Sequence, residues 1–195
     1  MAADLSPQPG PPGDGEWRAT SIATPLGTLV AVASDRGVVA ADLDVSFRTS
    51  VARLEATHDV AIRRDDRGLA DVRADARSYF GRRPRALATP VDLAIAHTDF
   101  WRGVFAATIA VPFGELRTYG DVAAAAGHPR AWRAAGHALR HCPVELWIPC
   151  HRIVPVGPGL GSYGGRPDLR EALLRHEGSL PTRGRRGRSE VRTGR

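Results

Sequence analysis

Hydrophobic and polar positions alternate in short, β-branched stretches between residues 17 and 44, most clearly along residues 28–33 (TLVAVA). A period of two is typical of strands that bury one face. Turn-forming residues separate these stretches at Pro25-Leu26-Gly27 and Asp35-Arg36-Gly37, where proline and glycine favour tight turns. The pattern predicts an antiparallel meander.

Helical spacing of the apolar residues follows the meander. It predicts one helix over residues 47–57 and a second over residues 69–80, while residues 87–95 have the composition of a further strand. We therefore expect a small α/β domain over residues 16–97. Its polar residues are scattered, which indicates a supporting role rather than a catalytic one.

The pattern becomes predominantly helical after residue 98. An apolar face predicts a helix over residues 100–109. Thr118 is a candidate N-cap for a short helix over residues 119–126. After a turn that contains glycine, a second helix is expected over residues 130–140. Two short helices joined in this way form a candidate helix-turn-helix, although such pairs are often simple packing units.

Both ends of the chain lack the apolar residues of a folded core. Residues 1–15 are rich in proline and glycine and predict a disordered leader, and residues 179–195 predict a flexible basic tail. The leader has no basic region followed by an apolar stretch, unlike a secretory signal. No run approaches the roughly 18 apolar residues of a membrane span. We expect a cytoplasmic protein without a membrane partner.

The chain is basic, with a formal charge of +6, and all 27 of its Lys and Arg residues are arginine. A positive balance suits a phosphate-rich partner. An arginine-only chain rich in alanine and glycine is equally typical of a GC-rich genome, however, and six of the arginines lie in the basic tail. Charge alone therefore leaves nucleic-acid binding open.

The chain has two cysteines, Cys142 and Cys150. Two sulfurs make neither a disulfide framework nor a zinc cage, so we expect no bound metal. His151 follows Cys150, and a base close to a thiol raises its nucleophilic fraction. Adjacent residues of an extended chain point to opposite faces, so a water or a bend would have to connect the two side chains. The spacing leaves a nucleophile and a buried structural cysteine both open.

The segment Pro149-Cys150-His151-Arg152-Ile153-Val154 resembles the active-site motif of the O6-alkylguanine-DNA alkyltransferases. The frame around it is similar to the same family in order and spacing, with Val111-Pro112-Phe113-Gly114-Glu115, Thr118-Tyr119-Gly120, Tyr163-Gly164-Gly165 and Leu174-Arg175-His176-Glu177-Gly178. The resemblance covers residues 98–178. It implies a mostly helical alkyltransferase domain with a helix-turn-helix, preceded by a ribonuclease-H-like α/β domain.

The resemblance also implies a suicidal DNA-repair protein, in which Cys150 takes an alkyl group, chiefly methyl, from O6 of guanine. His151 would act as base through a water, Glu177 would orient His151, and Tyr119 would donate a hydrogen bond to the guanine ring. The family's substrate pocket corresponds to Ile153, Tyr163 and Gly164. We expect a monomer that acts once, without a cofactor, on double-stranded DNA containing O6-alkylguanine.

A duplex hides its bases, so the modified nucleotide has to leave the stack. Arg133 matches the family's arginine finger, which fills the vacated space, and the resemblance places Ala134, Gly136 and Arg140 against the DNA as well. The small residues of this helix suit a minor groove only about 6 Å wide.

The sequence departs from the family at two positions. Cys142 stands where the family usually has an asparagine that braces the turn before the active-site segment, and a thiol is a weaker hydrogen-bonding group than an amide. Trp132 replaces a small residue beside the finger, and it could obstruct the groove, stack on DNA or point into the core. A lesion-binding protein without transfer activity and a Cys-His hydrolase are the alternatives.

Overall fold

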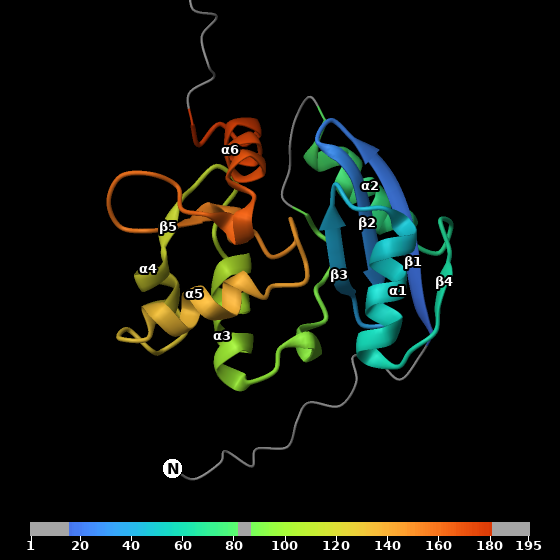
Figure 1. Cartoon of the computed structure of the whole chain (residues 1–195), viewed down its shortest axis with the longest axis horizontal. Coiled ribbons are helices and arrows are strands. Elements are labelled where there is room, and N and C mark those ends of the chain that lie inside the picture. Colours follow the sequence, from blue (N-terminus) through green and yellow to red (C-terminus); the bar gives the residue numbers. More distant parts are fainter. Residues whose placement is uncertain (1–15, 82–86, 181–195) are drawn as a thin grey trace, which may run out of the picture.

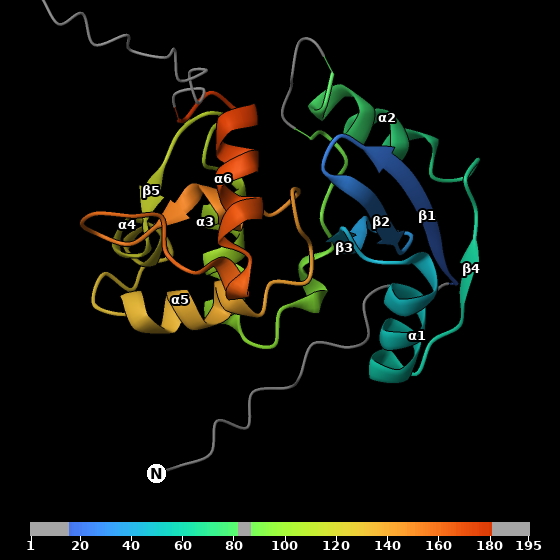
Figure 2. The same cartoon turned by 45° about the horizontal axis from the view of Figure 1, so that its top comes forward.

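The computed structural model describes residues 16–81 and 87–180, and it is a mixed α/β structure (Figure 1). The predicted leader and the predicted tail beyond residue 180 lie outside the described residues. In both views a sheet with two helices lies beside a group of short helices (Figures 1 and 2). Within the described ranges, no helix is long and apolar enough to cross a membrane.

The first three strands form the predicted meander: β1 (Trp17–Thr24), β2 (Gly27–Ala33) and β3 (Val38–Leu43). They pair antiparallel, and Thr24 faces Gly27 across the tight first turn. The sequence missed β4 (Ile62–Arg64), which pairs parallel to β1 and completes the order β3-β2-β1-β4. Three partly exposed residues are too few to show a period of two.

The two helices predicted in this region are confirmed as α1 (Phe47–His58) and α2 (Ala70–Tyr79). The Ser46 hydroxyl begins α1 by accepting a hydrogen bond from the Thr49 backbone at 3.1 Å, as an N-cap should. The last residue of α2, Tyr79, is fully buried. This position brings a side chain of the sheet region to the active site described below.

The prediction of a strand over residues 87–95 is wrong. Val91 forms only an isolated bridge to Val38, and Leu93–Ile95 is a short 3-10 helix, η1. The Asp92 carboxylate accepts from the Ala94 backbone at 3.0 Å and so begins this turn. Aspartate side chains compete for backbone N–H donors in this way. Pro90 has no backbone N–H, so it cannot donate a hydrogen bond to a neighbouring strand.

The predicted helices after residue 98 are confirmed with small shifts, as α3 (Asp99–Ile109), α4 (Tyr119–Ala125) and α5 (Trp132–Arg140). Thr118 caps α4 as expected. Its hydroxyl accepts from the Asp121 backbone at 3.2 Å, and the Asp121 carboxylate accepts from the Thr118 backbone at 2.8 Å. This reciprocal capping box satisfies two donors that the helix leaves free.

The sequence patterns did not predict the remaining helices and strands of the described residues. It contains β5 (Arg117–Thr118) and β6 (Ile153–Val154), which pair parallel, the 3-10 turns η2 (Cys150–Arg152) and η3 (Tyr163–Gly165), and α6 (Pro167–His176). The first turn of α6 holds a proline, whose fixed φ suits that position. These elements surround the cysteine.

Strand β3 also holds the segment that leads to the cysteine. The Ala41 backbone donates to the Pro143 carbonyl and accepts from the Glu145 backbone, both at 2.9 Å. The Glu145 carboxylate accepts in turn from the Leu43 backbone at 2.8 Å. One cluster of buried hydrophobic residues extends from β1 to α6. The sheet therefore shares its core with the helices.

Candidate active site

Cys150 begins the 3-10 turn η2, directly after the segment that β3 holds. Its backbone donates to the Ile148 carbonyl at 2.7 Å, and its thiol donates to the same carbonyl at 3.1 Å. The residue is only 6% exposed. The turn supplies the bend that an extended chain would lack. Among the described residues no hydrogen bond joins the thiol directly to His151, so a proton would pass between them through a water.

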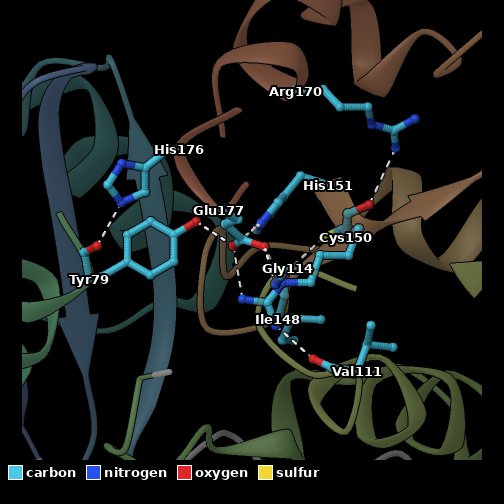
Figure 3. A network of polar contacts seen from close by, with 10 residues as sticks. Tyr79, Val111, Gly114, Ile148, Cys150, His151, Arg170, His176 and Glu177 are labelled. Carbon is cyan, nitrogen blue, oxygen red and sulfur yellow. Dashed lines mark hydrogen bonds and ion pairs between the residues drawn. The ribbon is translucent and has the colours of Figure 1, made fainter. Parts of the chain in front are cut away.

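His151 lies behind Cys150 and is fully buried (Figure 3). Its Nε2 lies 2.8 Å from Oε1 of Glu177. A carboxylate can only accept, so Nε2 carries the hydrogen and Nδ1 keeps a free lone pair. Nδ1 is buried and has no hydrogen-bond partner among the described residues. Since buried polar atoms are rarely left unpaired, this nitrogen is an acceptor available to a water or a substrate.

Glu177 is the centre of the buried network in Figure 3, and its side chain is 0% exposed. Arg152 donates to both carboxylate oxygens, at 2.8 and 2.9 Å. The Tyr79 hydroxyl and the Gly114 backbone donate at 2.6 and 3.2 Å. Burial alone would raise the pKa of Glu177, but the hydrogen bonds from His151, Arg152 and Tyr79 outweigh it and hold the pKa well below its ordinary value. Glu177 is therefore a carboxylate at neutral pH.

Burial also acts on the other members of the network. It lowers the pKa of His151 below its ordinary value, although the Glu177 charge opposes part of the change. His151 is thus neutral at pH 7 and free to accept a proton. Burial, together with the Glu177 charge, raises the pKa of Tyr79 far above its usual range, so Tyr79 remains a donor.

Sequence reasoning missed Tyr79 and gave no role to Arg152. Tyr79 lies 98 positions before Glu177, and no local pattern distinguishes it from a packing aromatic residue. Arg152 lies inside the active-site motif, so its place in the chain was visible. Its function as the cation that compensates a buried carboxylate follows only from the fold.

A cavity of about 290 Å³ opens in front of the Cys150 thiol. Several predicted site residues line it together with Cys150, namely Tyr119, Gly136, Arg140, Tyr163 and Gly164. Ile153, also assigned to the substrate pocket, belongs to β6, pairs with Arg117 and is fully buried, and it does not border this cavity. Its role in the pocket stays a prediction.

Arg170 fixes the loop over this cavity, and the sequence did not indicate it. The guanidinium is almost fully buried, its Nη2 lies 3.3 Å from the Cys150 carbonyl, and its Cζ lies 4.8 Å above the Tyr163 ring. Arg170 also donates to the Leu160 carbonyl. One side chain therefore joins the cysteine backbone to the loop that carries Tyr163.

The proposed DNA-binding residues divide into two groups on α5. Gly136 and Arg140 border the cavity, whereas Arg133 and Ala134 are exposed and do not. Trp132 is 51% exposed, and the Arg133 Cζ lies 4.7 Å above its ring. The alternative that Trp132 points into the core is wrong, because the first turn of α5 faces solvent.

Cys142 lines the same cavity as Cys150 but has a different environment. Burial raises the pKa of its thiol well above the ordinary value, and the neighbouring Cys150 adds to this. Its thiol makes a weak contact of 4.0 Å to the Val144 carbonyl and also interacts with the Cys150 thiol. The backbone bonds from Ala41 brace this segment instead. Cys142 therefore stays a protonated thiol.

No group of three or more His, Cys, Asp and Glu residues is placed to hold a metal ion in the part of the chain that the structure describes.

Comparison with known proteins identifies the family of this chain. Residues 99–179 match the family model of the 6-O-methylguanine DNA methyltransferase DNA-binding domain. The human methylated-DNA–protein-cysteine methyltransferase is 32% identical over 85% of this chain and 82% of its own length. The chain belongs to this family.

Other relatives match over different shares of their length. The methyltransferase of Methanosarcina acetivorans is 40% identical over 46% of this chain, and the match spans only 57% of that relative. The crystal structure of Mycobacterium tuberculosis OGT in complex with DNA has a TM-score of 0.67 and 28% identity, and covers 86% of this chain and 96% of that one.

Proposed function

We propose that this protein repairs DNA by transferring an alkyl group, chiefly methyl, from O6 of guanine to the sulfur of Cys150. The observation that carries the proposal is the pairing of the cavity-lining thiol with the buried imidazole behind it, whose Nδ1 has no other partner. A nucleophile, a base and a group that orients the base are the parts that such a transfer requires.

The side chains of Cys150, His151, Glu177 and Tyr119 are sufficient for the reaction. The thiol proton passes through a water to His151 Nδ1, and Glu177 stabilises the imidazolium that forms. The thiolate attacks the alkyl carbon, the bond from carbon to O6 breaks, and its electron pair stays with guanine, which takes up a proton. Tyr119, across the cavity, supports the departing base with its phenol hydrogen. A thiol and an O6-alkylguanine thus become a thioether and a guanine, with no cofactor.

The thioether is stable and Cys150 is consumed, so each molecule acts once. His151 is regenerated when its proton is passed on, but the sulfur is not. His151 and Glu177, which we call the relay, therefore serve to make one transfer rather than a catalytic cycle.

DNA recognition belongs to the helix pair α4 and α5, which we assign as a helix-turn-helix. The exposed face of α5 would enter the minor groove, with Ala134 and Gly136 allowing close approach and Arg140 near the cavity mouth. Arg133 would fill the space that the flipped nucleotide leaves, which offsets part of the few kcal/mol that flipping costs. The complex of the Mycobacterium tuberculosis relative with DNA supports DNA as the partner.

The proposal assigns different roles to the two parts of the chain. Residues 98–178 would carry the chemistry and residues 16–97 would support them, with the predicted leader and tail flanking both. The strand order β3-β2-β1-β4, in which a meander is extended by a parallel strand, supports the ribonuclease-H-like description of the sheet. We propose a cytoplasmic monomer.

The test is to incubate the protein with a duplex that bears O6-methylguanine and to measure the mass of the Cys150 peptide. We expect a gain of one methylene on Cys150 and none on Cys142. Cys150→Ala should abolish transfer and retain DNA binding, with Cys142→Ala as the matched control. Lesion binding without an adduct would indicate a binding-only protein, and turnover of thioesters would indicate a hydrolase.

A further inference from the structure

Trp132 is the most exposed tryptophan of the chain. Its relative exposure is 51%, compared with 1% for Trp17 and 4% for Trp147, and Trp101 is partly buried. A single exposed apolar residue is common and by itself implies nothing. Trp132 is unusual because it is the first residue of α5, the helix whose exposed face is assigned to DNA.

The second observation is the partner of the indole ring. The Arg133 guanidinium lies 4.7 Å above it, in a cation–π contact. The helix carries no acidic side chain, and Arg133, His137 and Arg140 are all exposed. The aromatic ring is therefore part of a positively charged face. Aromatic rings set among cations are typical of surfaces that bind nucleic-acid strands.

Trp132 also lies away from the cavity in front of Cys150. Gly136 and Arg140 border the cavity in front of Cys150, and Trp132 does not. The ring therefore leaves the approach to the thiol open, and it lies beside the side chain assigned to enter the duplex.

We propose that Trp132 is a second DNA-contacting residue, which exchanges the Arg133 guanidinium for a stacked nucleotide when the duplex binds. The inference rests on the proposed function. In the free protein the Arg133 guanidinium covers one face of the indole ring. When Arg133 enters the duplex it uncovers the indole face, and a base or sugar next to the flipped nucleotide then covers that face. Neither side chain is left without a partner in either state.

Fluorescence quenching by acrylamide provides a direct test. Trp132 is the tryptophan most open to the quencher, so a saturating lesion-free duplex should reduce quenching in the native protein. The protection should persist in Arg133→Ala, because the ring itself contacts DNA, and it should be lost in Trp132→Phe. Unchanged quenching of Trp132 in the saturated complex would overturn the proposal.

Transfer kinetics provide the second test. Trp132→Ala should slow transfer from a duplex roughly tenfold more than transfer from the free O6-alkylguanine base, as expected for one stacking contact. The double variant with Arg133→Ala should be slower than Arg133→Ala alone. Equal rates for the single and double variants would show that the ring serves only to hold Arg133, which contradicts a DNA contact.

Two controls separate this inference from the proposed function. Ile109→Ala removes another exposed apolar side chain, 39% exposed and on α3, and it should not change the ratio of duplex to free-base rates. If Cys150 receives no alkyl group from either substrate, the proposed function fails, while the quenching experiment still reports whether Trp132 contacts DNA.

Discussion

The relay behind Cys150 and the exposed face of α5 differ in almost every physical respect. Glu177 accepts from four residues at 2.6–3.2 Å, and its side chain and that of His151 are 0% exposed. On α5, Trp132 and Arg133 face solvent and stack on each other, and no side chain caps the helix.

Under the proposed function, the two regions divide the chemistry from DNA recognition. In a low-dielectric interior each polar group needs a partner, so the hydrogen bonds around Glu177 favour one arrangement, in which only His151 Nδ1 is left open. The face of α5 is left incomplete, and its contacts are available to a partner. Changes in the relay should therefore affect transfer from every substrate, whereas changes at Trp132 and Arg133 should affect mainly transfer from duplex DNA.

The largest effect is expected for Glu177→Gln. The amide retains one acceptor oxygen for His151 and Arg152 and removes the charge that stabilises the imidazolium. Transfer should slow about 10²- to 10⁴-fold, the usual contribution of acid–base catalysis, and equally on duplex and free base. Single-turnover rates measure this, with Glu171→Gln on α6 as the control, since Glu171 pairs with Arg175 at the surface. A loss confined to duplex substrates would contradict the assignment.

Arg133→Ala should have the next largest effect. Without the finger the flipped state loses the side chain that fills the stack, so transfer from duplex DNA should fall roughly tenfold to a hundredfold. Transfer from the free base needs no flipping and should fall much less. Comparable losses on both substrates would show that Arg133 has no specific role in base flipping. They would also contradict the proposed difference between the two regions.

Tyr79→Phe tests whether the sheet region takes part in the relay. The change removes one hydrogen bond to the charged Glu177 with little change in shape, which should cost about 1.5–3 kcal/mol of unfolding free energy in urea. The transfer rate should fall by less than about tenfold, because Arg152 and His151 still hold the carboxylate. In combination with Glu177→Gln, the two losses should be less than additive. Full additivity would mean that Tyr79 acts independently of Glu177.

The smallest effect is expected for Cys142→Ala. The contact of the thiol with the Val144 carbonyl is weak, at 4.0 Å, and the Ala41 backbone already braces the segment. Transfer rates should change less than about threefold on either substrate. A large loss on both would show that Cys142 belongs to the relay rather than to the cavity wall.

Local patterns predicted much of the fold. The meander, five helices and the Thr118 cap were visible because each depends on residues within a few positions of one another. The short strand β4 was missed, and residues 87–95 were wrongly expected to form a strand, because tertiary pairing and the Asp92 turn decide both.

The sequence by itself determined which functional groups are candidates for catalysis, since motifs were enough to name Cys150, His151, Tyr119 and Glu177. Only the tertiary structure decided how that chemistry is arranged. It turned the chain at Cys150, left His151 Nδ1 without a partner, and brought Tyr79 and Arg152 to Glu177. A motif records neighbours along the chain, whereas the pKa of a buried group depends on the residues that folding brings around it.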